Sequence, residues 1–321
     1  MLHLRLIVPA DTTDEVVALL GSTVGTAHLV VLPGAARSPA GDVVMCDVAR
    51  EAGDELIGAL RRLGIDRTGA ISVENLDLTL STHADKAEHE APGDSADAVL
   101  WEELTEATHE ESTFSVTYVS FLALATMLAA CGVMLDNAVL IVGAMAVGPE
   151  FGPLAGISTA VVQRAPRLVA RSLWALIGGF AVAMIVTAGF AWLLDAFGLF
   201  TPDMIDRPRP NTGFIWHPDW MSFVVAFLAG TAGTLSLTSA KSGALIGVAI
   251  SVTTVPAAAN AAVAFSYADY RQTIGSGQQL LANLGGIVLA GTLTLLLQKG
   301  LWRIRRTRKP PASTPGASVE A

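Results

Sequence analysis

In the first 80 or so residues of the chain, segments with the apolar spacing of a strand and segments with that of a helix follow one another. In Leu2–Val8 every second residue is apolar, which is typical of a strand with one buried face. Asp11–Leu20 and Asp54–Leu63 have helical spacing, and Gly64 follows the second helix in the position of a C-terminal cap. The remaining predicted strands are His28–Leu32, Asp42–Val48 and Ile71–Leu80, with a turn-rich segment at Pro33–Gly41.

These elements predict a soluble α+β domain over residues 1–82. Their order, β-α-β-β-α-β, is the ferredoxin-like pattern. Such a domain either binds a small effector or only mediates assembly, for example of a homo-oligomer. The segment contains no phosphate loop, metal cluster or catalytic pair that would decide between the two roles.

Residues 83–112 are acidic, with Lys86 as their single basic side chain apart from histidine. The first part, around Pro92-Gly93, is predicted to be a linker, and an amphipathic helical pattern begins at Ser95. Helices that lie on a membrane surface usually carry Lys and Arg toward anionic lipid. The acidic helix is therefore expected to pack on protein, or simply to present a solvated face.

Residues 113–300 are predicted to form a transmembrane domain. A helical span needs about 20 predominantly apolar residues. The sequence then predicts a polytopic α-helical membrane protein with about six spans and a basic, then Pro/Ser-rich tail at 301–321. The six segments are Ser115–Val133, Asn137–Val162, Ser172–Leu194, Trp220–Ser239, Ser242–Phe265 and Gln278–Gln298.

The basic residues near the ends of these segments predict an orientation. With six spans they all fall on one side, which the positive-inside rule makes cytoplasmic. Both termini would then be cytoplasmic, and the loop 195–219 would lie outside the cytoplasmic (plasma) membrane. The basic residues are Arg164, Arg167, Arg171, Lys241, Lys299, Arg303, Arg305, Arg306, Arg308 and Lys309.

Two apolar segments resemble each other and suggest an internal repeat. Residues 136–149 can be laid over 241–256, so that Leu140-Ile141 falls on Leu245-Ile246 and both segments run into a proline. Three spans per copy would invert the second copy in the membrane. Glycine- and proline-interrupted segments at matching places of inverted halves point to a transporter substrate site. Chance similarity between apolar segments is the alternative.

Glu150 is the acidic side chain inside the predicted second span. It stands between Gly148-Pro149 and Gly152-Pro153, which interrupt a continuous helix. One interpretation is an ion- or proton-coupling carboxylate or a filter residue, since intramembrane charges are expensive and usually functional. The other places Glu150 near the cytoplasmic end, paired with Arg164 or Arg167.

The second predicted half offers matching polar groups. Thr253, Thr254 and Asn260 surround Pro256, and they complete the candidate solute or ion site. In the first half, Asp136 and Asn137 are expected to cap the second span. Asn260 and Asn283 also fit ordinary interhelical hydrogen bonding or packing, and Lys241 fits a membrane-surface anchor.

Composition limits the remaining functions. Apolar residues make up 52% of the chain, charged residues 15%, and mean hydropathy is +0.52. The net charge of −9 arises mainly in residues 1–112, and no basic, aromatic surface suggests a nucleic-acid partner. Cys46 and Cys131 have no metal-ligand spacing. No catalytic motif is present, so the chain is expected to be no enzyme and to need no metal or cofactor.

The stretch Leu135–Pro153 resembles a known family. Gly143-Ala144-Met145, Pro149 and Gly152-Pro153 match the motif of the bacterial and archaeal "uncharacterised hydrophobic protein" family, domain of unknown function 389 (DUF389). Gly148 replaces the family's usual Ser, and Glu150-Phe151 replaces its usual Leu-Met. The resemblance covers roughly residues 100–300 and implies a polytopic membrane protein, in some members with a soluble N-terminal domain. It implies no substrate.

The sequence therefore predicts a membrane transporter or channel for a small solute or ion, with a regulatory or assembly domain at residues 1–82. The alternative is a non-transporting sensor or scaffold, in which the spans only anchor and oligomerise the N-terminal domain. The lipid bilayer is the expected partner in both cases.

Overall fold

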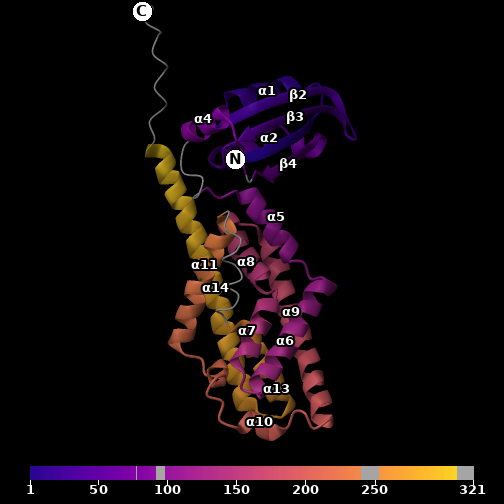
Figure 1. The fold of residues 1–321 in the computed structure, drawn as a ribbon, viewed down its shortest axis with the longest axis vertical. Helices are drawn as coiled ribbons and strands as arrows, with labels where there is room; N and C mark the ends of the chain where they lie inside the picture. Colours follow the sequence, from indigo (N-terminus) through magenta and orange to yellow (C-terminus); the bar gives the residue numbers. More distant parts are fainter. Residues whose placement is uncertain (77, 92–97, 240–252, 309–321) are drawn as a thin grey trace, which may run out of the picture. The chain divides into compact units, whose positions relative to one another are not determined.

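The computed structural model describes residues 1–76, 78–91, 98–239 and 253–308 (Figure 1). Lys241 and the first half of the predicted fifth span lie outside these described residues. The chain divides into two compact units. Unit 1 comprises residues 1–102 and 298–321, and unit 2 comprises residues 103–297.

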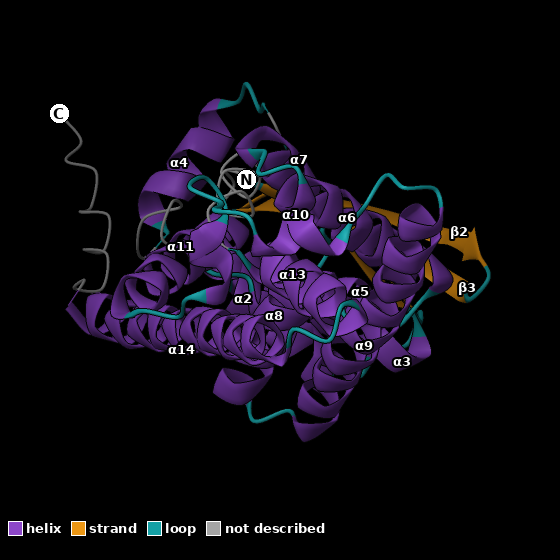
Figure 2. Ribbon diagram, turned by 90° about the horizontal axis from the view of Figure 1, so that it is seen from below, coloured by secondary structure: helices purple, strands orange, loops and turns teal. Residues whose placement is uncertain are grey.

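Unit 1 contains a small antiparallel sheet, drawn in orange in Figure 2. The strand order is β2-β3-β1-β4, with helices after β1 and β3, so the predicted order β-α-β-β-α-β is present. A short helix, α3, is added before the last strand. The elements are β1 (Leu2–Val8), α1 (Thr13–Ser22), β2 (Thr26–Arg37), β3 (Ala40–Val48), α2 (Arg50–Arg62), α3 (Ile65–Thr68) and β4 (Ala70–Asn75).

The alternation in β1 sets the core of unit 1. Leu2, Leu4, Leu6 and Val8 are fully buried in one cluster with apolar side chains of α1 and α2. Burying a side chain of this size contributes about 1.5–3 kcal/mol. The predicted inward face of this strand is therefore confirmed.

The predicted turn at Pro33–Gly41 is wrong over much of its length. β2 continues to Arg37 and β3 begins at Ala40, so the two strands form a long hairpin. The pairing register shifts between Ala27 and Val30 and again between Leu32 and Ala36. These irregularities let Gly34, at φ +63°, remain within the strand.

The predicted last strand is too long. β4 ends at Asn75 instead of Leu80, because its partner β1 begins at Leu2, the residue paired with Asn75. Part of the predicted linker is instead helix α4 (Thr82–Glu90). Ser81 explains its start, since the Ser81 hydroxyl accepts from the backbone N–H groups of His83 and Ala84.

Unit 2 is helical throughout its regular elements among the described residues. Its helices are α5 (Trp101–Glu111), α6 (Val116–Met134), α7 (Ala138–Val147), α8 (Phe151–Gln163), α9 (Pro166–Ala196), α10 (Pro202–Asp206), η2 (Gly213–Trp216), α11 (Trp220–Thr238), α13 (Thr254–Ser266) and α14 (Tyr270–Arg308). The first residues of α5 and the last of α14 belong to unit 1.

Four of these helices, α6, α9, α11 and α14, are long and apolar enough to cross a membrane. The pair α7 and α8 passes the same test together but is bent by 53°, so the described residues contain four candidate spans, or five if this pair counts as one span. The expected count of six is therefore not confirmed. The described part of the predicted fifth span is α13, whose 13 residues reach about 20 Å, less than the roughly 30 Å of a hydrocarbon core.

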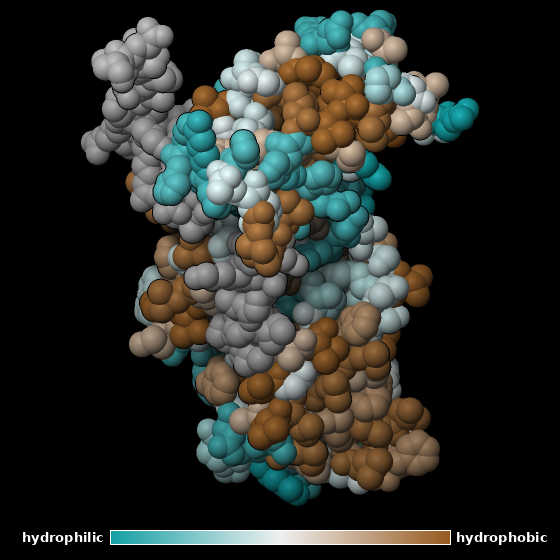
Figure 3. All heavy atoms as spheres, turned by 45° about the horizontal axis from the view of Figure 1, so that its top comes forward, coloured by the Kyte–Doolittle hydropathy of each residue, from teal (hydrophilic) through white to brown (hydrophobic). Residues whose placement is uncertain are grey.

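Seen from below in Figure 2, helix α13 is surrounded by other helices of unit 2, and it packs against α6, α7 and α9. Every residue from Thr254 to Ala264 is buried. The outward faces of the long helices are apolar instead, as with Trp174, Ile177 and Ile185 on α9. Hydrophobic residues cover much of the surface of unit 2 visible in Figure 3. This distribution is compatible with a multi-pass membrane protein.

Candidate functional site

Two helices of unit 2 begin side by side. Glu150 is the residue before α8, and Thr254 is the first residue of α13. The Thr254 hydroxyl donates to Glu150 Oε1 at 2.6 Å. We call this meeting point, residues 148–151 and 253–256, the junction. The unpaired N–H groups at both helix starts give the junction a partial positive charge.

The prolines stand at equivalent places in the two helices. Pro153 is the third residue of α8 and Pro256 the third of α13. N–H groups in the first turn have no partner within the helix, so a proline there removes no helical hydrogen bond. The prolines therefore fit the start of each short helix, and the expected break at Glu150 is present as two half-helices.

Gly148 allows the two chain segments to approach. A Cβ atom added at Gly148 would lie 2.3 Å from Glu150 Oε2 and 2.8 Å from a methyl group of Val255. Gly152 allows a second approach, because a Cβ atom there would lie 2.5 Å from Glu111 Cβ. The glycines of the motif thus fit close contacts around the start of α8.

Glu150 is only 5% exposed. Its Oε2 atom has no hydrogen-bond partner among the described residues, and neither has the hydroxyl of the nearby buried Tyr118. No ion pair joins Glu150 to a basic side chain in the described ranges, so the expected alternative of a pair with Arg164 or Arg167 is not observed. Arg164 follows the far end of α8, about 20 Å along the helix.

The two half-helices leave the junction toward opposite ends of unit 2 (Figure 1). α8 ends where Gln163 bonds Thr105 of α5, and we call this end, residues 105–113 and 163–172, the linker end. α13 ends where the Ser266 carbonyl accepts from Trp192. We call that end, residues 192–219 and 266–272, the loop end.

A chain of buried polar side chains connects the loop end to the junction. Gln272, Ser276, Gln279 and Asn283 follow one face of α14 and are buried. We call these residues, with Arg209, Asn260, Thr253, Thr254 and Glu150, the polar chain. Arg209 donates to Gln272 and to Asn260, Asn260 donates to Ser276, Gln279 donates to Asn283, and Asn283 donates to Thr253.

Cavities approach the junction from both ends. One of about 450 Å³ lies beside Gly148, Pro149 and Gly152, and residues of the linker end such as Glu111 also line it. Another of about 240 Å³ reaches Thr253 and Asn283, and Phe214 and Asp219 of the loop end line its other side. The two cavities therefore border the junction, one on the side of the linker end and the other on the side of the loop end.

Most of the sequence-predicted site residues gather here. Gly148, Pro149, Glu150, Thr253, Thr254 and Pro256 form or border the junction, Gly152 and Pro153 follow in α8, and Asn260 belongs to the polar chain. Asn137 does not take part. Its side chain caps α7 by accepting from the N–H groups of Val139 and Leu140, as expected. Asp136 binds Asn211 and Thr212 of the loop instead.

Sequence reasoning missed Arg209, Gln272, Ser276 and Gln279. Arg209 stands in a proline-rich loop, where nothing predicts burial. The signal on α14 was present, because Gln272, Ser276, Gln279 and Asn283 are spaced four, three and four residues apart. That spacing places all four on one face of a helix.

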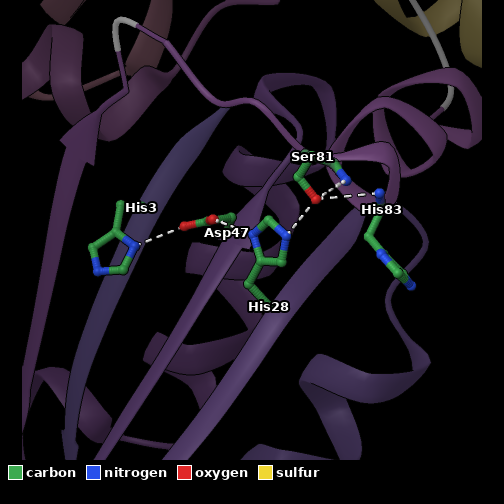
Figure 4. A network of polar contacts seen from close by, with 6 residues as sticks. His3, His28, Asp47, Ser81 and His83 are labelled. Carbon is green, nitrogen blue, oxygen red and sulfur yellow. Dashed lines mark hydrogen bonds and ion pairs between the residues drawn. The ribbon is translucent and has the colours of Figure 1, made fainter.

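Unit 1 contains a separate polar network (Figure 4). Asp47 on β3 joins the Nδ1 atoms of His3 at 2.7 Å and His28 at 2.6 Å. The other ring nitrogen of His28 lies 2.8 Å from Ser81 Oγ, which caps α4. The network therefore links the start of α4 to the sheet. Burial acts to raise the pKa of Asp47, but the hydrogen bonds from His28 and His3 hold it below its ordinary value.

Asp47→Asn is expected to destabilise unit 1 by about 1–3 kcal/mol near neutral pH, since contacts with a charged acceptor are lost. Because the folded-state pKa is lowered, the stabilisation from Asp47 is complete above its ordinary pKa of 3.8 and is lost as the pH falls through the lowered value. Labelling of the buried Cys46 thiol with dithiodipyridine, in a Cys131→Ser background, measures opening of the domain. Equal acid sensitivity of both proteins would contradict the prediction.

The described structure thus combines apolar helices, compatible with a multi-pass membrane protein, with a buried junction of two half-helices. Residues 145–289 match the model of a family described as a domain of unknown function, DUF389. The match confirms the resemblance inferred from the sequence, and the matched residues include the junction and the polar chain.

A relative with the printed name uncharacterized protein MJ0678, from Methanocaldococcus jannaschii, is 25% identical over 169 residues. The matched region covers 53% of this chain and 50% of the relative, so the chain spans about half the length of that protein. No solved structure matches the chain.

Proposed function

We propose that unit 2 is a transporter or channel for a small solute or ion in the cytoplasmic membrane, and that the junction is its solute site. The observation that carries the proposal is Glu150, a buried carboxylate without a cationic partner in the described residues, where two half-helices start. Transporters use such discontinuous helices to build midplane sites. The flanking cavities supply a route from each end.

The geometry of the half-helices supports an inverted repeat. α8 and α13 each contain 13 residues, with proline at the third position. They leave the junction in opposite directions. Two copies inverted in the membrane would produce this arrangement, with α6 corresponding to α11 and α9 to α14.

The proposed orientation places the linker end in the cytoplasm. Arg164, Arg167 and Arg171 lie at that end, as the positive-inside rule requires. The α7–α8 pair then forms one bent crossing, and both termini are cytoplasmic. In this arrangement unit 1 regulates the transporter or assembles it into an oligomer, and no catalytic step is involved.

Purified protein in liposomes tests the proposal. Glu150→Gln is expected to lower solute flux by about tenfold or more, equivalent to at least about 1.4 kcal/mol in the barrier, because the amide cannot alternate between charged and neutral forms. Pro149→Ala is expected to lower flux as well, since α7 can then extend toward α8. Flux is measured with a panel of small anions and cations, including rubidium and inorganic phosphate.

Glu106→Gln is the matched control, because Glu106 is an exposed carboxylate on α5. It should leave flux unchanged. If Glu150→Gln and Pro149→Ala also leave it unchanged, these residues have no part in the mechanism. If the wild-type protein moves none of the panel, the sensor or scaffold function is favoured instead.

A further inference from the structure

Arg209 is a buried charge held by neutral groups. The residue is 8% exposed, and its guanidinium donates to the side-chain oxygens of Asn260 and Gln272. No carboxylate lies within ion-pair distance of it in the described part of the chain. These contacts use two of the five N–H donors of a guanidinium. A buried cation of this kind favours an anionic partner.

Two of the three acidic groups whose charges act on Arg209 are engaged elsewhere. The carboxylate of Asp136 accepts from the backbone and side chains of Asn211 and Thr212. Asp269 caps α14 by accepting from the N–H group of Gln272. Burial lowers the pKa of Arg209, and the charges of Asp136, Asp269 and Asp206 oppose that effect. The charges of these acids stabilise the guanidinium, and none of the acids forms an ion pair with it in the described ranges.

A cavity of about 430 Å³ at the loop end contains Arg209. Its charged lining consists of Arg207, Arg209 and Arg271 against Asp206 and Asp269, so positive charge is in excess by one even with His217 neutral. Arg271 lies over the ring of Trp216, 5.6 Å from its centre. The close approach of Gly275, where a Cβ atom would lie 2.3 Å from the Trp216 carbonyl oxygen, fixes this wall of the cavity.

The polar chain continues inward from this cavity. Asn260, Gln279 and Asn283 each carry two amide N–H groups, and the described bonds to Ser276, Asn283 and Thr253 use one group of each. The polar chain ends at the junction, where the starts of α8 and α13 favour negative charge. Glu150, the resident anion of the junction, lies at the same place. When Glu150 takes up a proton, the half-helix starts can stabilise another anion in its place.

We propose that the transported solute is a small oxyanion, with a carboxylate or a phosphate-like group, and that Arg209 receives it at the loop end. This inference rests on the proposed transport function and adds the substrate class. The anion contacts Arg209 first and then follows the polar donors toward the half-helix starts.

Uptake by proteoliposomes tests the substrate class. Radiolabelled inorganic phosphate and oxalate serve as the anionic probes, and rubidium serves as the cationic probe. Wild-type protein is expected to take up at least one of the two anions and to exclude rubidium. Uptake of rubidium without either anion overturns this inference and leaves the transport function standing. If none of the three probes is taken up, both the anionic substrate class and the proposed transport function are overturned.

Arg209→Gln tests the role of the guanidinium. It should lower anion uptake by about tenfold or more, a change of about 1.4 kcal/mol, while Arg209→Lys, which keeps the charge, should restore part of it. Arg167→Gln, at an exposed arginine of α9, should leave uptake unchanged.

Thermal unfolding in detergent provides a readout that does not need flux. Phosphate or oxalate should raise the unfolding temperature of the wild type and of Arg167→Gln, and should not raise that of a folded Arg209→Gln protein. If Arg209→Gln does not fold, Arg209→Lys replaces it, with a smaller shift expected than in the wild type. A stabilisation or uptake that neither Arg209 variant changes removes Arg209 from the site.

Discussion

Asn260→Leu is expected to lower the free energy of unfolding of unit 2 by about 3 kcal/mol. Asn260 is fully buried, and its Oδ1 atom accepts from the Arg209 guanidinium at 2.9 Å. Leucine fills a similar volume without an acceptor, so a buried charge loses one of its two described acceptors. The loss exceeds that of a neutral hydrogen bond, because desolvation of a charged group is left uncompensated.

Chemical unfolding in detergent, followed by helical circular dichroism, measures this change. Asn283→Leu is the matched control, since Asn283 is also a buried amide with two side-chain contacts, but both contacts are neutral. Asn283→Leu is expected to lower the free energy of unfolding by about 1–2 kcal/mol. Equal losses for the two variants would show that Asn260 contributes nothing through the charge of Arg209.

Gly230→Val is the other change with a large expected effect. A Cβ atom at Gly230 of α11 would lie 2.8 Å from both the Cα atom and the carbonyl oxygen of Ile287 on α14. These are backbone atoms that cannot rotate away, so the two helices must separate. Overpacking of this kind costs about 1–3 kcal/mol and sometimes more. Small residues at such crossings are what allow helices in membranes to pack closely.

The same unfolding measurement applies to this pair of helices. Gly285→Val on α14 is the control, because no atom lies within 4 Å of a Cβ atom built at Gly285. Gly285→Val should change the free energy of unfolding only by the small difference in helix propensity between glycine and valine. If the two valine variants unfold alike, the contact between α11 and α14 is not as close as the structure shows it.

The parts of the fold that depend on local pattern were predictable from the sequence. The period of Leu2, Leu4, Leu6 and Val8 defined the buried face of β1, and the Gly/Pro motif around Glu150 located the break between α7 and α8. Each signal lies within one short segment. The family resemblance depends on the same motif.

The missed parts depend on contacts between distant segments. β4 ends at Asn75 because β1 offers no partner beyond Leu2, which the apolar pattern of Leu76, Leu78 and Leu80 could not reveal. Arg209 became a site residue only when the fold placed it against Asn260 and Gln272, about 50 and 60 residues further along the chain. In the sequence alone, Arg209, Asn260 and Gln272 each look like an ordinary loop residue or a residue that packs between helices.

Helix α13 has a consequence for biogenesis. A segment that enters a bilayer independently does so because its side chains partition into lipid, and it needs about 20 apolar residues. α13 has 13 residues, rich in alanine and buried from Thr254 to Ala264 by other helices. Taken alone α13 is too short to span a bilayer, so in a membrane-spanning chain its final position depends on packing against α6, α7 and α9. The half-helix that completes the junction is then among the last elements to settle, so the proposed solute site forms only when the helices of unit 2 have packed together.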